Sequence, residues 1–122
     1  MAIDGVKIID SDTGYDIYNY VIGSYKDGVS ADKIVETMLA EEKDYCIDDF
    51  YSEIYWTALA YSLWKIGHLP DDVKEKTMGI IKKGADEFWL EIDGNALKQR
   101  QKNLDKLAIQ LENENPKPIK VL

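Results

Sequence analysis

The residue types that most often act as nucleophiles or general bases are scarce, because the 122 residues include one histidine and one cysteine. His68 follows Gly67 at an expected turn between two helices, and the sequence places no serine or carboxylate as its partner. Cys46 stands among carboxylates, which raise the pKa of a thiol and make it a poorer nucleophile. We therefore predict no catalytic residue, and interpret His68 as a turn residue and Cys46 as a packing or incidental one.

Motifs for metals and cofactors are also missing from the sequence. Structural zinc sites need several Cys or His ligands, and a di-iron bundle needs two Glu-x-x-His pairs. Residues 10–14 begin like a calcium loop, but Tyr15 replaces its turn glycine and Val21 its bidentate carboxylate. No glycine-rich phosphate loop occurs. We therefore expect no metal, no cofactor and no enzymatic activity. A small hydrolase or metal enzyme that uses some of the 23 carboxylates is kept as a minor alternative.

Acidic side chains are the abundant chemical feature, since 23 Asp and Glu residues outnumber 15 Lys and Arg residues and give a formal net charge of −8. The imbalance lies in residues 1–64, which hold thirteen acids and four lysines, whereas residues 65–122 hold ten acids and eleven bases. Within residues 36–53, seven acids are opposed only by Lys43. Nucleic acids are not expected as ligands, because proteins that bind them offer cationic surfaces to the phosphates.

The acidic stretch has two interpretations. It is either a solvated helical face that keeps the protein soluble, or a docking surface for a basic partner. A field of one sign accelerates the encounter with a partner of opposite charge, and tyrosine is enriched in interface hot spots. The docking interpretation predicts that the partner is bound by Glu41, Glu42, Asp44, Tyr45, Asp48, Asp49, Tyr51 and Glu53.

Helices must position these residues. Apolar residues recur at three- and four-residue steps, and N-caps or glycines bound the segments, so helices are predicted at about residues 13–26, 30–39, 49–66, 70–83, 85–91 and 95–112. The segment 49–66 is apolar on nearly every side, which is typical of a helix that others surround. Lysines and Arg100 are expected on the solvent-facing sides of the last helix. Residues 6–9 resemble a strand, but a lone strand has nothing to pair with.

The predicted fold class is therefore all-α, a compact bundle of about five to six helices around a central Trp- and Tyr-rich helix at about residues 49–66. We expect a single domain over residues 1–122, with irregular ends at 1–10 and 113–122. The amino end has no basic region leading into an apolar stretch, and no run of about 18 apolar residues occurs. These features predict a cytoplasmic protein with no membrane partner.

The central and following segments carry a pattern that resembles a family of small, acidic, all-helical bacterial proteins of unknown function. The pattern reads Trp56-x-Ala58-Leu59-Ala60, Trp64-Lys65-x-Gly67-x-Leu69, Val73-Lys74-Glu75 and Ile80-Ile81 before Gly84, with Asp12-Thr13-Gly14-Tyr15-Asp16 upstream. The resemblance spans roughly residues 11–90. Two positions depart from the family: residues 2–5 replace its Trp-Gly start, and Leu63 replaces its glutamine.

Such families resemble, in size and acidity, the immunity proteins of contact-dependent and polymorphic toxin systems. The resemblance implies a protein that binds and neutralises a cognate toxin, expected to be a basic nuclease, by covering its phosphate-binding cleft. It also implies core roles for Trp56, Leu59, Trp64 and Val73. The alternative is an adaptor or regulatory protein without enzymatic activity that binds a basic protein through the same acidic face.

Overall fold

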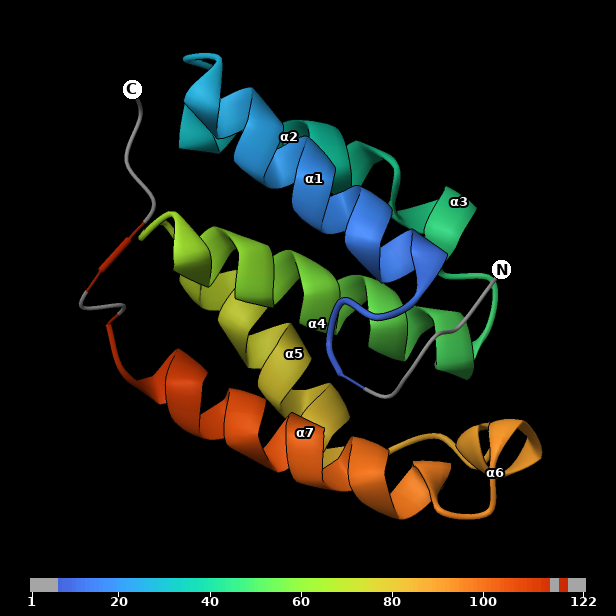
Figure 1. The fold of residues 1–122 in the computed structure, drawn as a ribbon. Helices are drawn as coiled ribbons and strands as arrows, with labels where there is room; N and C mark the ends of the chain where they lie inside the picture. Colours follow the sequence, from blue (N-terminus) through green and yellow to red (C-terminus); the bar gives the residue numbers. More distant parts are fainter. Residues whose placement is uncertain (1–6, 115–116, 119–122) are drawn as a thin grey trace.

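The computed structural model describes residues 7–114 and 117–118, and within them the chain forms seven helices and no strand (Figure 1). The all-α prediction is confirmed. The helices are α1 (Asp12–Lys26), α2 (Ala31–Ala40), α3 (Glu42–Tyr45), α4 (Asp49–Lys65), α5 (Asp71–Lys83), α6 (Trp89–Ile92) and α7 (Ala96–Glu112). The strand-like residues Ile8 and Ile9 form a turn and pack against the core, while Val6 lies outside the described residues.

Local side-chain bonds fix where three of the helices begin. The side chains of Ser11, Ser30 and Asp48 each accept a hydrogen bond from the backbone N–H three residues later, at 2.9, 3.2 and 2.8 Å. Each bond satisfies an amide that has no partner inside the helix. Two glycines end helices where the backbone enters the left-handed region, Gly67 at φ +77° and Gly84 at φ +103°. The predicted bounds of α1, α2, α4 and α5 therefore agree closely with the observed ones.

Helix α4 is the centre of the fold, as predicted. Eleven of its 17 residues are buried, and it contacts α1, α3, α5 and α7. In Figure 1, α1 and α2 lie on one side of α4, and α5 and α7 lie on the other. The side chains of Trp56, Leu59 and Val73 are buried, which agrees with the core roles expected for them.

Three details differ from the sequence prediction. The polar residues 42–45 form the one-turn helix α3, which raises the number of helices in the described part of the chain to seven. Trp64 is only half-buried, and its Nε1 donates a hydrogen bond to the Asn113 carbonyl at 2.7 Å. Asn95, which the sequence predicts as the N-cap of the last helix, does not cap α7 with its side chain; instead the Asp93 carboxylate accepts a hydrogen bond from the Asn95 N–H at 2.8 Å.

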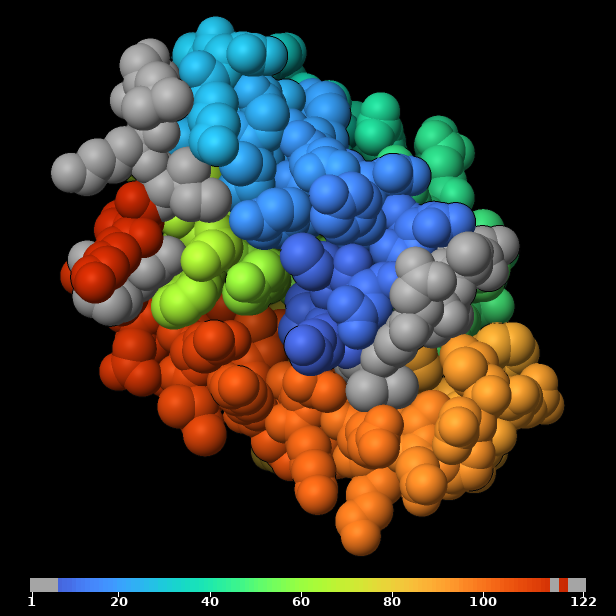
Figure 2. All heavy atoms as spheres, viewed as in Figure 1, coloured from blue at the N-terminus to red at the C-terminus, as the bar shows by residue number. Residues whose placement is uncertain are grey.

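The segment predicted as a helix over residues 85–91 is a turn followed by the short α6. Trp89 points into the core, whereas Phe88 and Leu90 are exposed. In Figure 2, α6 and its flanking residues, coloured orange, form a corner of the molecule at the lower right. Among the helices of the described residues, none combines the length and the apolar character needed to cross a bilayer.

Candidate functional site: an acidic groove beside α4 and α5

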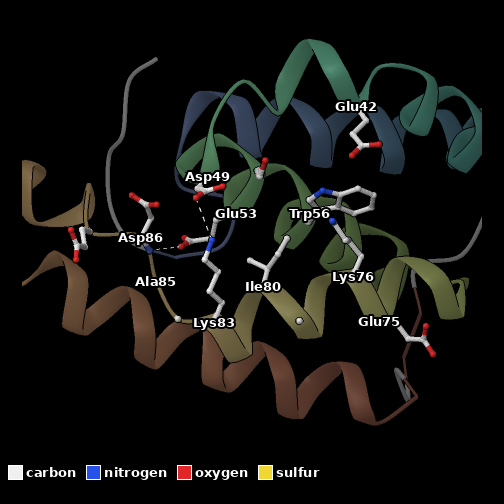
Figure 3. A pocket seen from close by; sticks show the side chains of 14 residues that line it. Glu42, Asp49, Glu53, Trp56, Glu75, Lys76, Ile80, Lys83, Ala85 and Asp86 are labelled. Atoms are coloured by element: carbon white, nitrogen blue, oxygen red, sulfur yellow. Dashed lines mark hydrogen bonds and ion pairs between the residues drawn. The ribbon is translucent and has the colours of Figure 1, made fainter.

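A groove of about 750 Å³ is lined by residues of α3, α4 and α5 and by residues 84–87, which follow α5 (Figure 3). We call it the acidic groove, because its charged lining residues are six carboxylates and two lysines: Glu42, Asp49, Glu53, Glu75, Asp86, Glu87, Lys76 and Lys83. These carboxylates come from four separate segments of the chain. The fold therefore concentrates negative charge beyond the single acidic stretch that the sequence shows.

The two lysines are held at defined places in the groove. Lys83 Nζ lies 3.2 Å from Asp49 Oδ2, and both side chains are exposed, so this pair contributes little to stability. Lys76 Nζ lies 5.9 Å from the centre of the Trp56 ring. Figure 3 shows Glu42 on the opposite side of Trp56 from Glu75. The lysines thus compensate only part of the negative charge.

Glu53 differs from the other acids, because its side chain is 2% exposed. Its Oε2 accepts hydrogen bonds from Arg100 Nε at 2.7 Å and Trp89 Nε1 at 2.9 Å, and its Oε1 accepts one from the Asp86 N–H at 2.8 Å. Both oxygens are therefore used inside the protein. The expectation that Glu53 pairs with a partner's cation is corrected: its carboxylate holds α6 and α7 against α4.

Arg100 is the cation of this buried centre, although the sequence predicted it on a solvent-facing side of α7. Its side chain is 1% exposed. Besides Glu53, it donates hydrogen bonds to the Lys7 carbonyl and to Thr57 Oγ1, each at 3.1 Å, and its guanidinium lies 4.7 Å from the centre of the Trp89 ring. Burial lowers the pKa of Arg100, and the Glu53 carboxylate opposes that shift.

The predicted partner-binding residues divide into two groups. Glu42, Asp49 and Glu53 line the acidic groove. The others lie outside the groove lining, on α3 and at the start of α4: Glu41, Asp44, Tyr45, Asp48 and Tyr51. The carboxylates in this second group are exposed.

Both predicted tyrosines are half-buried rather than free in solvent. The Tyr45 ring stacks on Tyr55 with centroids 5.4 Å apart, and the Tyr51 ring meets Phe50 edge-on at 5.6 Å. Burial raises the pKa of Tyr45, and the charges of Glu41, Asp16 and Asp44 raise it further. Each tyrosine thus offers a partner only part of its ring.

Three groove acids, Glu75, Asp86 and Glu87, were not singled out from the sequence. They lie in the second half of the chain, where bases balance acids, so the net charge of that half hides them. For Asp86 and Glu87 a signal is nevertheless present, because residues 85–95 hold four acids and no Lys or Arg. A shorter charge window would have identified this segment.

The two candidates for conventional chemistry have unremarkable surroundings. His68 is exposed beside the Tyr25 ring, with centroids 5.7 Å apart. Cys46 is half-buried, and burial raises the pKa of its thiol; the Glu42 charge adds to this effect, while Ser52 and Lys76 oppose it. Across residues 7–114 and 117–118, no three His, Cys, Asp or Glu side chains are grouped so that they would hold a metal ion.

No protein-family model, curated protein or solved structure that was compared with this chain matches it.

Proposed function

We propose that this protein is an immunity protein, which binds a cognate basic protein toxin and neutralises it through the acidic groove and the adjoining acids of α3 and α4. The observation that carries the proposal is the gathering of five carboxylates besides the buried Glu53, from four segments, around one groove that holds two lysines. Exposed Glu41, Asp44 and Asp48 extend the same charge along the chain beside the groove.

The charge distribution suits inhibition of a nuclease-type toxin. Such an enzyme needs a cationic cleft for phosphate, and an acidic protein surface competes for that cleft while accelerating association. Arginine and lysine of the toxin would form charge-assisted hydrogen bonds with the groove carboxylates. The inhibitor itself then needs no catalytic group, and binding in a one-to-one complex is sufficient.

Co-expression tests this proposal. The protein encoded by the gene directly upstream is induced in a bacterial strain that lacks both genes, with or without this chain. The expected result is growth arrest by the upstream product alone and restored growth when this chain is present. Growth arrest that this chain does not relieve would contradict the proposal. That result is expected if the chain is an adaptor or a protein unrelated to toxin defence.

The control for co-expression is a variant that folds but has altered charge at the proposed surface. Asp44→Lys/Asp49→Lys changes two exposed acids, of which Asp49 forms an exposed ion pair with Lys83. Its rescue should be weaker at equal expression level. Asp27→Lys/Asp32→Lys makes the same change in net charge beside the α1–α2 turn, at the other end of α1 and α2 from α3 (Figure 1), and should rescue fully.

A further inference from the structure

Three large apolar side chains are exposed together at α6. We call Phe88, Leu90 and Ile92 the α6 apolar cluster; their exposed fractions are 46%, 49% and 40%. They fall within five consecutive residues of one helical turn: Phe88 and Ile92, four residues apart, share one side, and Leu90 lies on the other side of the buried Trp89. The other exposed large apolar residues of the described chain, such as Ile109 on α7, occur singly, which is normal for a protein surface. A local concentration is typical of an interaction site.

The chain that carries this cluster is firmly attached to the core. Trp89, in the middle of the cluster, is 1% exposed and donates its Nε1–H to Glu53. The buried Phe50 ring lies 4.6 Å from the Phe88 ring and 5.0 Å from the Trp89 ring, measured between centroids. A surface held in place before binding loses little conformational entropy when a partner docks.

The charges around the cluster specify the partner. Asp86 and Glu87 precede the three apolar residues, Asp93 follows them and the exposed Glu91 lies between Leu90 and Ile92, and residues 85–95 contain no Lys or Arg. Asp86 and Glu87 also line the acidic groove, so the cluster continues the proposed toxin-binding surface. A second copy of this chain would bring the same four carboxylates against each other, which is repulsive. A basic protein would meet them with opposite charge.

We infer that the α6 apolar cluster is the apolar centre of the toxin contact and inserts into an apolar pocket edged by Lys and Arg side chains of the basic partner. This inference rests on the proposed function. It specifies which part of the surface contributes to the affinity of the complex, in contrast to the acidic residues that raise the rate of association. A few residues in well-packed, desolvated pockets near the centre of an interface dominate its affinity.

The double substitution Leu90→Ser/Ile92→Ser tests the inference and leaves Trp89 and Phe50 in place. Its affinity for the purified upstream-encoded protein, kept catalytically inactive, is measured by calorimetry at 50 and 200 mM salt. We expect the Kd to rise about tenfold or more at both salt concentrations, with an unchanged salt dependence, because no charge is altered. The control Ile109→Ser removes an apolar residue that is 68% exposed on α7, and should bind as the wild type does.

The outcomes separate this inference from the proposed function. Tight wild-type binding that Leu90→Ser/Ile92→Ser leaves unchanged would overturn the role of the α6 apolar cluster and leave the proposed function standing. Absence of wild-type binding would contradict the proposed function and the inference with it. Sedimentation of this chain alone provides a further test: a dimer that the double substitution abolishes would show that the cluster binds a second copy, against the inference.

Discussion

Glu53 and Arg100, which lie 47 residues apart in the chain, form a buried ion pair with 2.7 Å between Oε2 and Nε. The pair joins the central helix α4 to α7. The same carboxylate accepts hydrogen bonds from Trp89 of α6 and from the Asp86 N–H, so it also fixes the segment that carries the α6 apolar cluster. One buried carboxylate thus organises the corner of the molecule where the proposed partner binds.

Removing this buried charge should destabilise the fold strongly. In Glu53→Gln, Arg100 keeps its charge and its burial but loses its counter-ion, and the new amide cannot accept all three hydrogen bonds that Glu53 accepts. We expect the free energy of unfolding in urea to fall by about 3–5 kcal/mol. A loss of less than about 1 kcal/mol would contradict a structural role for the pair.

The double variant Glu53→Leu/Arg100→Met is the matched control. It removes both charges at once and leaves no ion buried alone, although the Trp89 and Asp86 donors lose their acceptor. We expect it to be more stable than Glu53→Gln, and the cycle completed by the single variants Glu53→Leu and Arg100→Met should be clearly non-additive.

Tyr55 links α4 to α2 and makes stability sensitive to alkaline pH. Its hydroxyl donates to the Met38 carbonyl at 2.5 Å, and burial raises the pKa of Tyr55 above its ordinary value of 10.0. The unfolded chain therefore releases this proton at lower pH than the folded protein, so stability falls as the pH rises above about 10. Tyr55→Phe should cost about 0.5–1.5 kcal/mol at neutral pH and should make the alkaline decline shallower. Urea unfolding of both proteins between pH 8 and 11 measures this decline. If the stability of Tyr55→Phe fell as steeply as that of the wild type, the alkaline decline would belong to other groups.

The Cys46 thiol should react slowly with alkylating reagents near neutral pH. Burial and the Glu42 charge raise its pKa above the ordinary 9.0, so the rate of iodoacetamide modification should reach half its maximum above pH 9. Glu42→Gln should move that midpoint to lower pH, whereas Glu36→Gln on α2 should leave it unchanged. A midpoint below 9 in the wild type would be incompatible with the surroundings of Cys46 described above.

Much of the fold follows from local sequence patterns. Three helix starts are predicted by N-cap residues, Ser11, Ser30 and Asp48. The continuous apolar character of residues 49–66 predicts the central helix from the sequence alone. The one-turn helix α3 escaped prediction because its residues 42–45 are mostly charged and show no apolar period. Helices this short are formed by tertiary context rather than by their own propensity.

The candidate site was less predictable, because burial of charged groups is decided by distant partners. Glu53 belongs to an acidic stretch and Arg100 to a basic helix, and each alone favours solvent exposure; only their meeting makes burial favourable. Asp86 and Glu87 line the groove because residues 84–87 bring the chain from the end of α5 back towards α4. No local sequence pattern predicts this path of the chain. The exposed acids of α3 and the start of α4 were identifiable from composition alone.

The rate of association with the upstream-encoded protein tests the central claim most directly. Stopped-flow measurements at 50 and 200 mM salt compare the wild type with Asp44→Lys/Asp49→Lys and with Asp27→Lys/Asp32→Lys, two variants of equal net charge. If the acidic surface of α3 and α4 steers the partner, the first variant associates about tenfold more slowly at low salt and loses much of its salt dependence, while the second stays close to the wild type. Equal rates for the two variants would contradict the claim that this surface receives the partner.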